Sequence, residues 1–322
     1  MAAFPLVPRY SKMIILGQQF GNMPYIIAIV AGLSVGDPFL SYEESQGISI
    51  SHDETGDGTG AVESEVSRSI RRKFEEARDQ FSSLDPGCDV LRLLCAIGAY
   101  ECGGATDEFC EERFLRVKIM KEIRKLRIQI SNIVNNQLSG IVAPVELTAT
   151  LPPPSPLQTR TIKQIVAATY LDHIAIRSDL LDPSSSSRTP KLTQRVEYTP
   201  FSSLLSSSST HDKRTAIIHP NSAMASLNAA PDYVIYSDLR ESQHNGRLRI
   251  LPLTEVAGRD IEALAKGTPL ISYSKPLNYP PPRTFSENGV VKKEVYVVPR
   301  FGVRGRGWEL PSIKRVENLI KS

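Results

Sequence analysis

Residues 24–38 read PYIIAIVAGLSVGDP and decide the fold of the first part of the chain. Proline is favoured in the first turn of a helix, and the seven residues after Pro24 are apolar on every side. A helix that is apolar all round is predicted to lie at the centre of a domain. Gly36 and Pro38 are expected to end it. Because a membrane span needs about 20 apolar residues, this shorter run predicts no membrane partner.

Further helices are predicted on both sides of this central one. Apolar residues recur every three or four positions from Val62 to Phe81, which indicates an amphipathic helix. Asp85 followed by proline is expected to cap a strongly apolar helix over 90–100, and Thr106 to cap the next one. These elements predict an all-helical first domain.

A basic helix is expected to complete this domain. Its apolar stripe consists of Leu115, Ile119, Ile123, Leu126, Ile130 and Ile133. Residues 37–62 differ, because they contain six acidic residues and no Lys or Arg. We therefore predict a helical domain over 9–137 with a disordered acidic insertion at 40–61.

The pattern changes after a proline-rich linker, residues 138–160. One more helix is expected over Ile162–Ile176, and short β-like segments then alternate with polar, partly Ser-rich loops. The segments are Arg195–Tyr198, Thr215–His219, Tyr233–Tyr236, Arg247–Ile250, Leu270–Tyr273 and Glu294–Val298. They predict a small barrel such as the five-stranded OB-fold over 161–282, followed by a basic extension over 283–322. The fold class is therefore predicted to be α+β.

Composition and motifs argue against independent catalysis. The 322 residues include 38 basic and 35 acidic side chains, so any nucleic-acid footprint must be local. The cysteines at 88, 95, 102 and 110 lack metal-site spacing and are interpreted as reduced packing residues. The sequence contains no phosphate loop of the form GxxxxGK[ST] and no GxSxG or HExxH motif. We expect no catalytic residue, metal or cofactor in this chain.

The candidate binding residues are basic or polar side chains able to donate to phosphates. Ile218 and His219 are predicted to end a strand, so the polar residues that follow either cap a turn or form a cluster at a barrel mouth. Phe301 and Trp308, in an Arg- and Gly-rich stretch, either bind RNA or anchor the tail on the barrel. The predicted RNA-binding residues are His219, Asn221, Ser222, Arg124, Arg127, Arg247 and Arg249.

Several segments, in this order, resemble the DEAH-box RNA helicases. Residues 4–13 resemble the junction between their winged helix and ratchet (HA2) domain, which would make residues 1–8 a remnant of the winged helix. Residues 23–39 and 114–129 are similar to ratchet helices, and 218–222 with 233–236 to strands of the family's OB-fold. Segments from Leu251 to Pro311 are similar to the nucleolar members that act in small-ribosomal-subunit assembly.

The resemblance implies a role and also a limit. Members of this kind use ATP and Mg²⁺ to remodel pre-rRNA and its guiding snoRNA, which places them in the nucleus and nucleolus. The family's two RecA-like domains have no counterpart here, so this chain is expected to be a C-terminal module or a truncated gene model. Its expected partners are single-stranded RNA and a helicase core in cis. The alternative is a protein-docking module that binds an assembly factor or a helicase activator.

Overall fold

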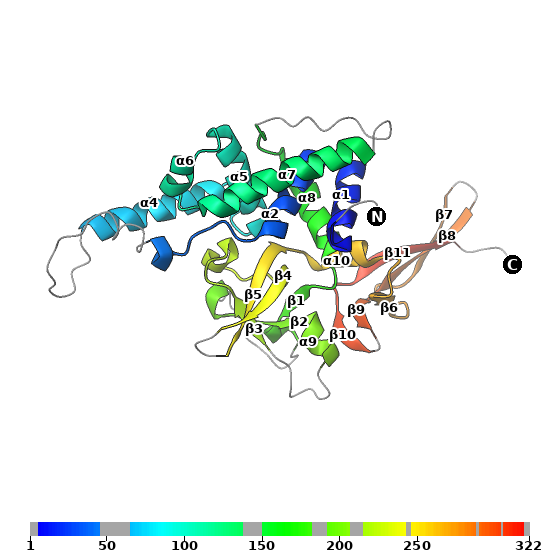
Figure 1. The fold of residues 1–322 in the computed structure, drawn as a ribbon. Helices are drawn as coiled ribbons and strands as arrows, with labels where there is room; N and C mark the ends of the chain where they lie inside the picture. The colour runs from blue at the N-terminus through cyan, green and yellow to red at the C-terminus, as the bar shows by residue number, and fades with distance from the viewer. Residues whose placement is uncertain are drawn as a thin grey trace. The chain divides into compact units, whose positions relative to one another are not determined.

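The computed structural model describes residues 6–45, 65–137, 150–181, 192–206, 215–242, 246–287, 290–303 and 305–318. The chain divides into two compact units. The first unit contains Met1–Thr169 together with Pro220–Leu227, and the second contains Tyr170–His219 and Asn228–Ser322. The fold is mixed α and β, as predicted, with a helical first unit and a second unit built mainly from strands (Figure 1).

The helices of the first unit follow the predicted order. They are α1 (Pro8–Gln19), α2 (Met23–Val35), α4 (Glu65–Phe81), α5 (Asp89–Cys102), α6 (Asp107–Glu112), α7 (Val117–Gln137) and α8 (Pro156–Thr169). Within the described ranges, no helix is both long enough and apolar enough to cross a bilayer.

Helix α2 forms the centre of the first unit, as predicted. Pro24 lies in its first turn, and Gly36 ends it with a φ of 129°. Nine of its residues are buried, in a run from Met23 to Gly32. Gly17 of α1 lets the two helices approach closely, because a Cβ there would lie 2.9 Å from the Ile26 side chain. The all-apolar pattern therefore predicted burial correctly.

Capping was predicted correctly at one helix and wrongly at another. Thr106 caps α6 by accepting a hydrogen bond from the Phe109 N–H at 3.2 Å. Asp85 does not cap α5, which begins at Asp89 after a turn. Asp85 accepts a hydrogen bond from the Gly87 N–H at 2.9 Å instead, so the Asp-Pro pair shapes the turn.

The buried stripe of α7 differs from the predicted one. Ile123 and Ile130 are buried as expected, whereas Ile119, Leu126 and Ile133 are only half-buried. The stripe also contains Met120, Arg127, Ser131 and Val134. The prediction used apolar residues only and therefore left out the buried Arg127. As a result, the predicted stripe lies to one side of the buried face of α7.

Three predicted segment boundaries need correction. Residues 42–45 are helical and Ser45 is buried, so the predicted disorder is wrong over 40–45; residues 46–61 lie outside the described part. Pro156 begins α8, although the proline-rich linker was expected to extend to residue 160. Helix α8 belongs to the first unit, whereas we expected it in the barrel domain.

The second unit contains a closed five-stranded barrel. Its strands are β1 (Ile174–Arg177), β2 (Glu197–Pro200), β3 (Ala216–Ile218), β4 (Tyr233–Glu241) and β5 (Leu248–Glu255). The order around the barrel is β1-β2-β3-β5-β4, with β3 and β5 parallel and β1 closing onto β4. Residues 174–176 are therefore a strand, not the end of a helix as expected.

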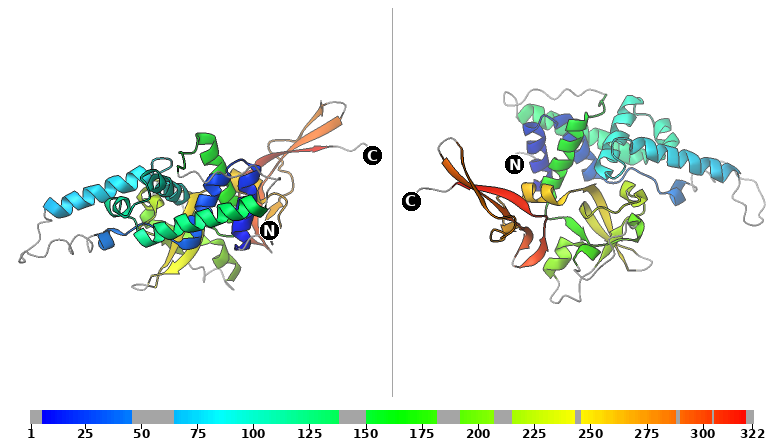
Figure 2. Two further views of the ribbon diagram at one scale, coloured as in Figure 1. Left: turned by 45° about the horizontal axis from the view of Figure 1, so that its top comes forward. Right: turned by 180° about the vertical axis from the view of Figure 1, so that it is seen from behind.

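Two three-stranded sheets follow the barrel. Their strands are β6 (Ile271–Tyr273), β7 (Arg283–Glu287), β8 (Val290–Val297), β9 (Pro299–Val303), β10 (Arg306–Glu309) and β11 (Ile313–Asn318). One sheet has the order β10-β9-β6 and the other β11-β8-β7, which extends away from the first (Figure 2). The segments at 270–273 and 294–298 therefore lie outside the barrel. A short helix, α10 (Gly258–Ala265), lies between β5 and β6.

An aromatic cluster anchors the chain after the barrel, as the anchoring alternative predicted. The Phe301 ring lies 5.1 Å from Phe201 and 5.2 Å from Trp308, and Trp308 stacks on Tyr233 of β4 at 6.2 Å. Gly302 and Gly307 face each other across β9 and β10, and a Cβ on either would lie 1.9 Å from a backbone oxygen. The glycines of this Arg- and Gly-rich stretch therefore serve strand pairing.

Candidate nucleic-acid interface

Two of the predicted RNA-binding arginines converge on one carboxylate. Arg127 and Arg124 of α7 each donate to the Glu101 carboxylate of α5 at 3.1 Å. The Glu101 side chain is 4% exposed and that of Arg127 is 9% exposed, whereas that of Arg124 is 46% exposed. Arg127 is therefore part of the interior of the first unit, and Arg124 covers the same carboxylate from outside.

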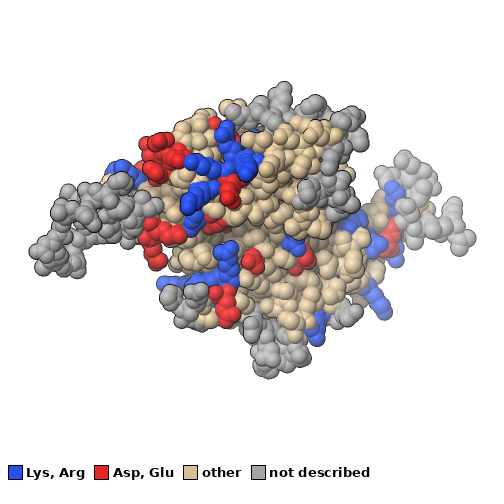
Figure 3. All heavy atoms as spheres, in the orientation of Figure 1, with Lys and Arg blue, Asp and Glu red and all other residues tan. Residues whose placement is uncertain are grey.

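The outer face of α7 remains basic. Lys118, Lys121, Arg124 and Lys125 are exposed there, and Lys121 pairs with Asp107 at 2.7 Å. Figure 3 shows Lys and Arg side chains gathered over α7 beside acidic ones. This face can meet a phosphate backbone without rearrangement of the core.

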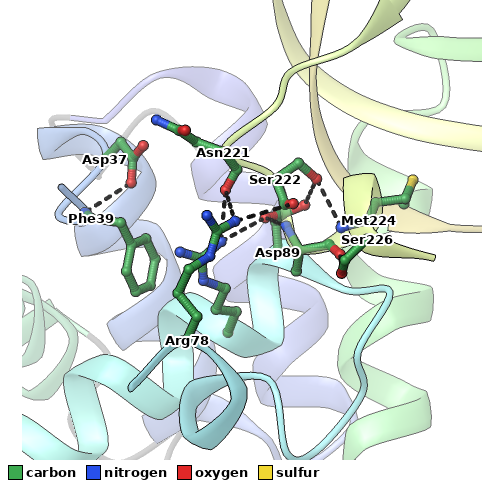
Figure 4. Close-up of polar contacts among 10 residues, drawn as sticks. Asp37, Phe39, Arg78, Asp89, Asn221, Ser222, Met224 and Ser226 are labelled. Carbon is green, nitrogen blue, oxygen red and sulfur yellow. Dashed lines mark hydrogen bonds and ion pairs between the residues drawn. The ribbon is translucent and has the colours of Figure 1, made fainter. Parts of the chain in front are cut away.

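The loop that carries Asn221 and Ser222 docks within the first unit. Figure 4 shows Arg78 of α4 and Asp89 of α5 around it. The Ser222 hydroxyl donates to Asp89 at 2.5 Å and accepts from the Met224 N–H at 3.0 Å, which caps η3 (Ala223–Ser226). The Ala223 N–H donates to the other Asp89 oxygen at 2.9 Å. The Ser222 hydroxyl therefore serves as the N-cap of η3.

Two arginines hold the backbone of the same loop. The Asn221 carbonyl accepts from Arg92 at 2.8 Å and from Arg78 at 3.0 Å. Arg92 is 2% exposed and lies over the Phe39 ring, 3.9 Å from its centroid. The side-chain amide of Asn221 is turned away from these guanidinium groups (Figure 4). The main chain of Asn221, not its amide, makes the contact to the arginines.

Burial changes the ionisation of this cluster. It raises the pKa of Asp89, while the nearby Arg92 charge and the bonds from Ser222 and Ala223 oppose that rise. It lowers the pKa of Arg92 to about 10 and that of Arg78 in the same direction. With a pKa of about 10, Arg92 remains charged at neutral pH, 3.8 Å from the Asp89 carboxyl.

The remaining predicted residues lie together on the barrel of the second unit. The His219 N–H donates to the Ile250 carbonyl at 2.9 Å, directly after β3. Arg249 of β5 pairs with Ile217 on one side and with Arg240 of β4 on the other. Arg247 lies directly before β5, and because side chains alternate along an extended chain, we expect it on the same outer face as Arg249.

Arg240 is a member of this outer face that the sequence analysis did not include. Its side chain is 64% exposed and lies 3.9 Å from Asp238. Pairing register places it opposite Arg249, which no local pattern indicates. The partly buried Arg78 and Asp89 and the buried Arg92 were also missed, since they look like ordinary positions of amphipathic helices. The outer face, defined as His219, Arg240, Arg247 and Arg249, is a compact group of cationic and polar side chains.

No group of His, Cys, Asp and Glu suited to a metal ion occurs among the residues that the structure describes. The described cysteines carry no disulfide, and Cys88 and Cys110 are buried. Cys102 is exposed, so the prediction that all four cysteines are packing residues is wrong at that position.

Comparison with known proteins gives two kinds of match. Residues 7–93 match the model of the helicase associated domain (HA2), described as ratchet-like. The chain is 31% identical to a putative ATP-dependent RNA helicase, PB1A10.06c, of Schizosaccharomyces pombe, over 99% of the chain and 26% of that protein.

Two further relatives are similar over a comparable span. The identity is 33% with the probable ATP-dependent RNA helicase DHR1 of Saccharomyces cerevisiae, over 94% of the chain and 25% of that protein. It is 31% with the probable ATP-dependent RNA helicase DHX37 of Homo sapiens, over 98% of the chain and 24% of that protein. The chain thus spans about a quarter of the length of these relatives.

Proposed function

From the correspondence of this chain to a region of the DEAH-box RNA helicases that includes their ratchet-like domain, we propose that it is an RNA-binding and regulatory module of such an enzyme. The observation that carries the proposal is the match to ATP-dependent RNA helicases over almost the whole chain. ATP and Mg²⁺ would act elsewhere in the complete enzyme, on a helicase core joined to this module.

The barrel supports RNA binding. A closed barrel of five strands in the order β1-β2-β3-β5-β4, with β3 parallel to β5, is the arrangement that we expect of an OB-fold. OB-folds bind oligonucleotides, and single strands are held by a positively charged groove that follows the backbone. The outer face contributes Arg240, Arg247 and Arg249 to such a surface.

We propose a revised set of RNA-contacting residues. Arg127 and Ser222 are buried and bonded to carboxylates, so we assign them to the stability of the first unit. We retain His219, Arg247 and Arg249, together with Arg124, and add Arg240. Their contacts to phosphate would be independent of sequence and sensitive to salt.

The cellular process is part of the proposal. We infer a role in ribosome biogenesis, in the nucleus and nucleolus, with pre-rRNA or snoRNA as the RNA. The support is the series of segments that resembles the nucleolar helicases of small-subunit assembly, together with the similarity to DHR1 and DHX37.

Protein docking is a second candidate function, which exposed apolar side chains favour. Phe20, at the end of α1, is 60% exposed, and Leu157 of α8 is 73% exposed. Apolar side chains of this size at the surface suit a protein contact. An assembly factor, a helicase activator or the helicase core itself would be the partner. Such binding would depend weakly on salt, unlike binding to RNA.

Binding of the purified chain to a labelled oligouridylate tests the proposed function. We expect affinity to fall steeply with salt, because each phosphate contact releases a counterion. The double variant R247Q/R249Q should weaken binding about tenfold, since each lost bond to a charged phosphate is worth about 1.5–3 kcal/mol at most. The control R71Q/R72Q removes the same charge from exposed positions of α4.

Two results would contradict the proposal. One is an absence of salt-sensitive binding to the oligouridylate by the unaltered chain. The other is an equal loss of affinity in R247Q/R249Q and R71Q/R72Q, which would assign the effect to net charge and not to the outer face.

A further inference from the structure

The sheet β11-β8-β7 has two faces of different chemistry. Register places Phe285 of β7 opposite Lys292, Arg283 opposite Glu294, and Lys314 of β11 opposite Tyr296. Because directly opposed residues project to the same side of a sheet, these residues share one face. We call it the aromatic-basic face. Register places on it Arg283, Phe285, Glu287, Val290, Lys292, Glu294, Tyr296, Lys314, Val316 and Asn318.

The aromatic-basic face is turned outward. Phe285 is 38% exposed, Val316 47% and the Lys314 side chain 54%. The opposite face packs inward at one end, where Val295 and Val297 of β8 are 0% and 2% exposed, whereas the side chains of Arg315 and Glu317 on the same face are 51% and 44% exposed. A phenylalanine and a valine at the surface of a sheet that already has a packed side indicate a contact surface.

The charge of this face favours an anionic partner. It holds three cations, Arg283, Lys292 and Lys314, and two acidic residues: Glu294, which Lys314 contacts at 2.7 Å, and Glu287, which register places opposite Val290. Three positive charges and two negative charges leave a net charge of +1. The opposite face also has cations, but Arg315 lies 5.3 Å over the Tyr273 ring and 3.8 Å from Glu317.

The placement of the rings distinguishes RNA from an acidic peptide. Each ring lies directly opposite a cation: Phe285 beside Lys292, and Tyr296 beside Lys314. The two pairs lie four positions apart on β8, or about 13 Å at about 3.3 Å per residue. Base–aromatic stacking with a cation for the adjacent phosphate is the mode by which sheets hold single-stranded nucleic acid, whereas an acidic peptide needs only the cations.

We propose that the aromatic-basic face of the β11-β8-β7 sheet is a second single-stranded RNA-binding surface, separate from the outer face of the barrel. Phe285 and Tyr296 would stack on bases, and Arg283, Lys292 and Lys314 would contact phosphates. The inference rests on the proposed RNA-binding function. It adds a surface that extends the path of the RNA beyond the barrel (Figure 2).

A charge-matched pair of variants tests the cations. K292Q/K314Q removes two charges from the aromatic-basic face, and K293Q/R315Q removes two from the opposite face of the same strands. We expect K292Q/K314Q to weaken binding of a labelled oligouridylate to the full chain roughly tenfold. It should also reduce the salt slope by about 1.4, at about 0.7 per phosphate contact with a single strand. K293Q/R315Q should change affinity less than about twofold, since its cations make no phosphate contact in this arrangement.

A second variant tests stacking without a change in charge. F285A should weaken binding about fivefold or more, because stacking on one base is worth that factor at the lower end of its range. F285Y keeps the ring and should bind as the unaltered chain does. Melting curves of all variants identify any that fail to fold.

The outcomes separate this inference from the proposed function. If the unaltered chain binds RNA but folded K292Q/K314Q and F285A bind equally well, the second surface is refuted and the barrel remains. Equal losses in K292Q/K314Q and K293Q/R315Q refute it as well. If the unaltered chain binds no RNA, the proposed function fails together with the inference. Retained RNA affinity with lost binding of an acidic peptide would assign the face to a protein partner and overturn the proposal.

Discussion

The buried arginines of the first unit and the exposed arginines of the barrel have different roles. Arg92 and Arg127 are 2% and 8% exposed and contact buried carboxylates or a backbone carbonyl. Arg240 of the barrel is 64% exposed, and Arg247 beside it is exposed as well. Residue type and local charge are alike in the two regions, so burial alone separates an arginine that holds the fold from one that can meet a phosphate.

The physical reason is the cost of removing a charge from water. A buried guanidinium is tolerated only with a partner of opposite charge and with hydrogen bonds, and removal of one partner leaves the other uncompensated. An exposed guanidinium keeps its hydration and contributes little to stability. Substitutions of the buried arginines of the first unit should therefore change stability, and substitutions of the exposed arginines of the barrel should change RNA affinity.

The largest expected effect is at Arg92. R92M leaves the partly buried Asp89 without the cation 3.8 Å away and should lower the free energy of unfolding by about 3 kcal/mol, the lower end for a broken buried pair. Denaturant titration of the purified chain measures it. The double variant D89N/R92M should recover part of the loss, because the Asp89 charge is removed together with that of Arg92. A loss below about 1 kcal/mol for R92M would contradict the stated difference between buried and exposed arginines.

The second largest effect on stability is expected at the two arginines that contact Glu101. R127M should cost up to about 3 kcal/mol, the lower end for a broken buried pair, because Arg124 still contacts Glu101 at 3.1 Å. R124Q should cost less than about 1 kcal/mol, as for surface pairs. Equal losses of stability in R127M and R124Q, measured by the same titration, would show that exposure does not determine how much each arginine contributes.

Ser222 should have an intermediate effect on stability and none on RNA affinity. S222A removes a helix cap and the hydrogen bond to Asp89, which predicts a loss of about 1–2 kcal/mol. Binding of the folded variant to an oligouridylate should be unchanged. S226A, in the same short helix, is the control that keeps the contact to Asp89. Weaker binding by fully folded S222A would return Ser222 to the RNA interface.

Glu44 predicts a pH dependence. The Ser41 N–H and the Arg116 guanidinium lower its pKa to about 2, from an ordinary value of 4.5. A lowered pKa in the folded state stabilises the protein above pH 4.5, and this contribution is lost as the pH falls from 4.5 towards 2. The stability difference between the unaltered chain and E44Q should therefore shrink between pH 4.5 and 3. A difference independent of pH would contradict the assignment.

The smallest expected effect on stability is on the barrel. R247Q/R249Q should change the free energy of unfolding by less than about 0.5 kcal/mol, as is usual for surface positions. Its melting curve should match that of R71Q/R72Q. A large loss would mean that the outer face supports the fold and would remove the contrast between the two units.

The sequence allowed much of the fold to be predicted, because local patterns carry the information. Pro24 and Gly36 bound α2 as their conformational preferences require, and Thr106 caps α6. Alternating short segments predicted a barrel. Errors arose where distant contacts override a local preference: Ile174 begins a strand that pairs with β4, although the pattern continues a helix.

The site could be predicted only in part, for the same reason. The sequence alone identified the basic and polar candidates for RNA binding and the likeness to RNA helicases. Which candidates lie outside was decided by tertiary structure. Ser222 meets Asp89 across 133 positions of sequence, and Arg127 meets Glu101 across 26. Composition and periodicity report what each residue prefers, but the burial of a charge depends on the partner that folding brings to it, and that partner lies far away in the chain.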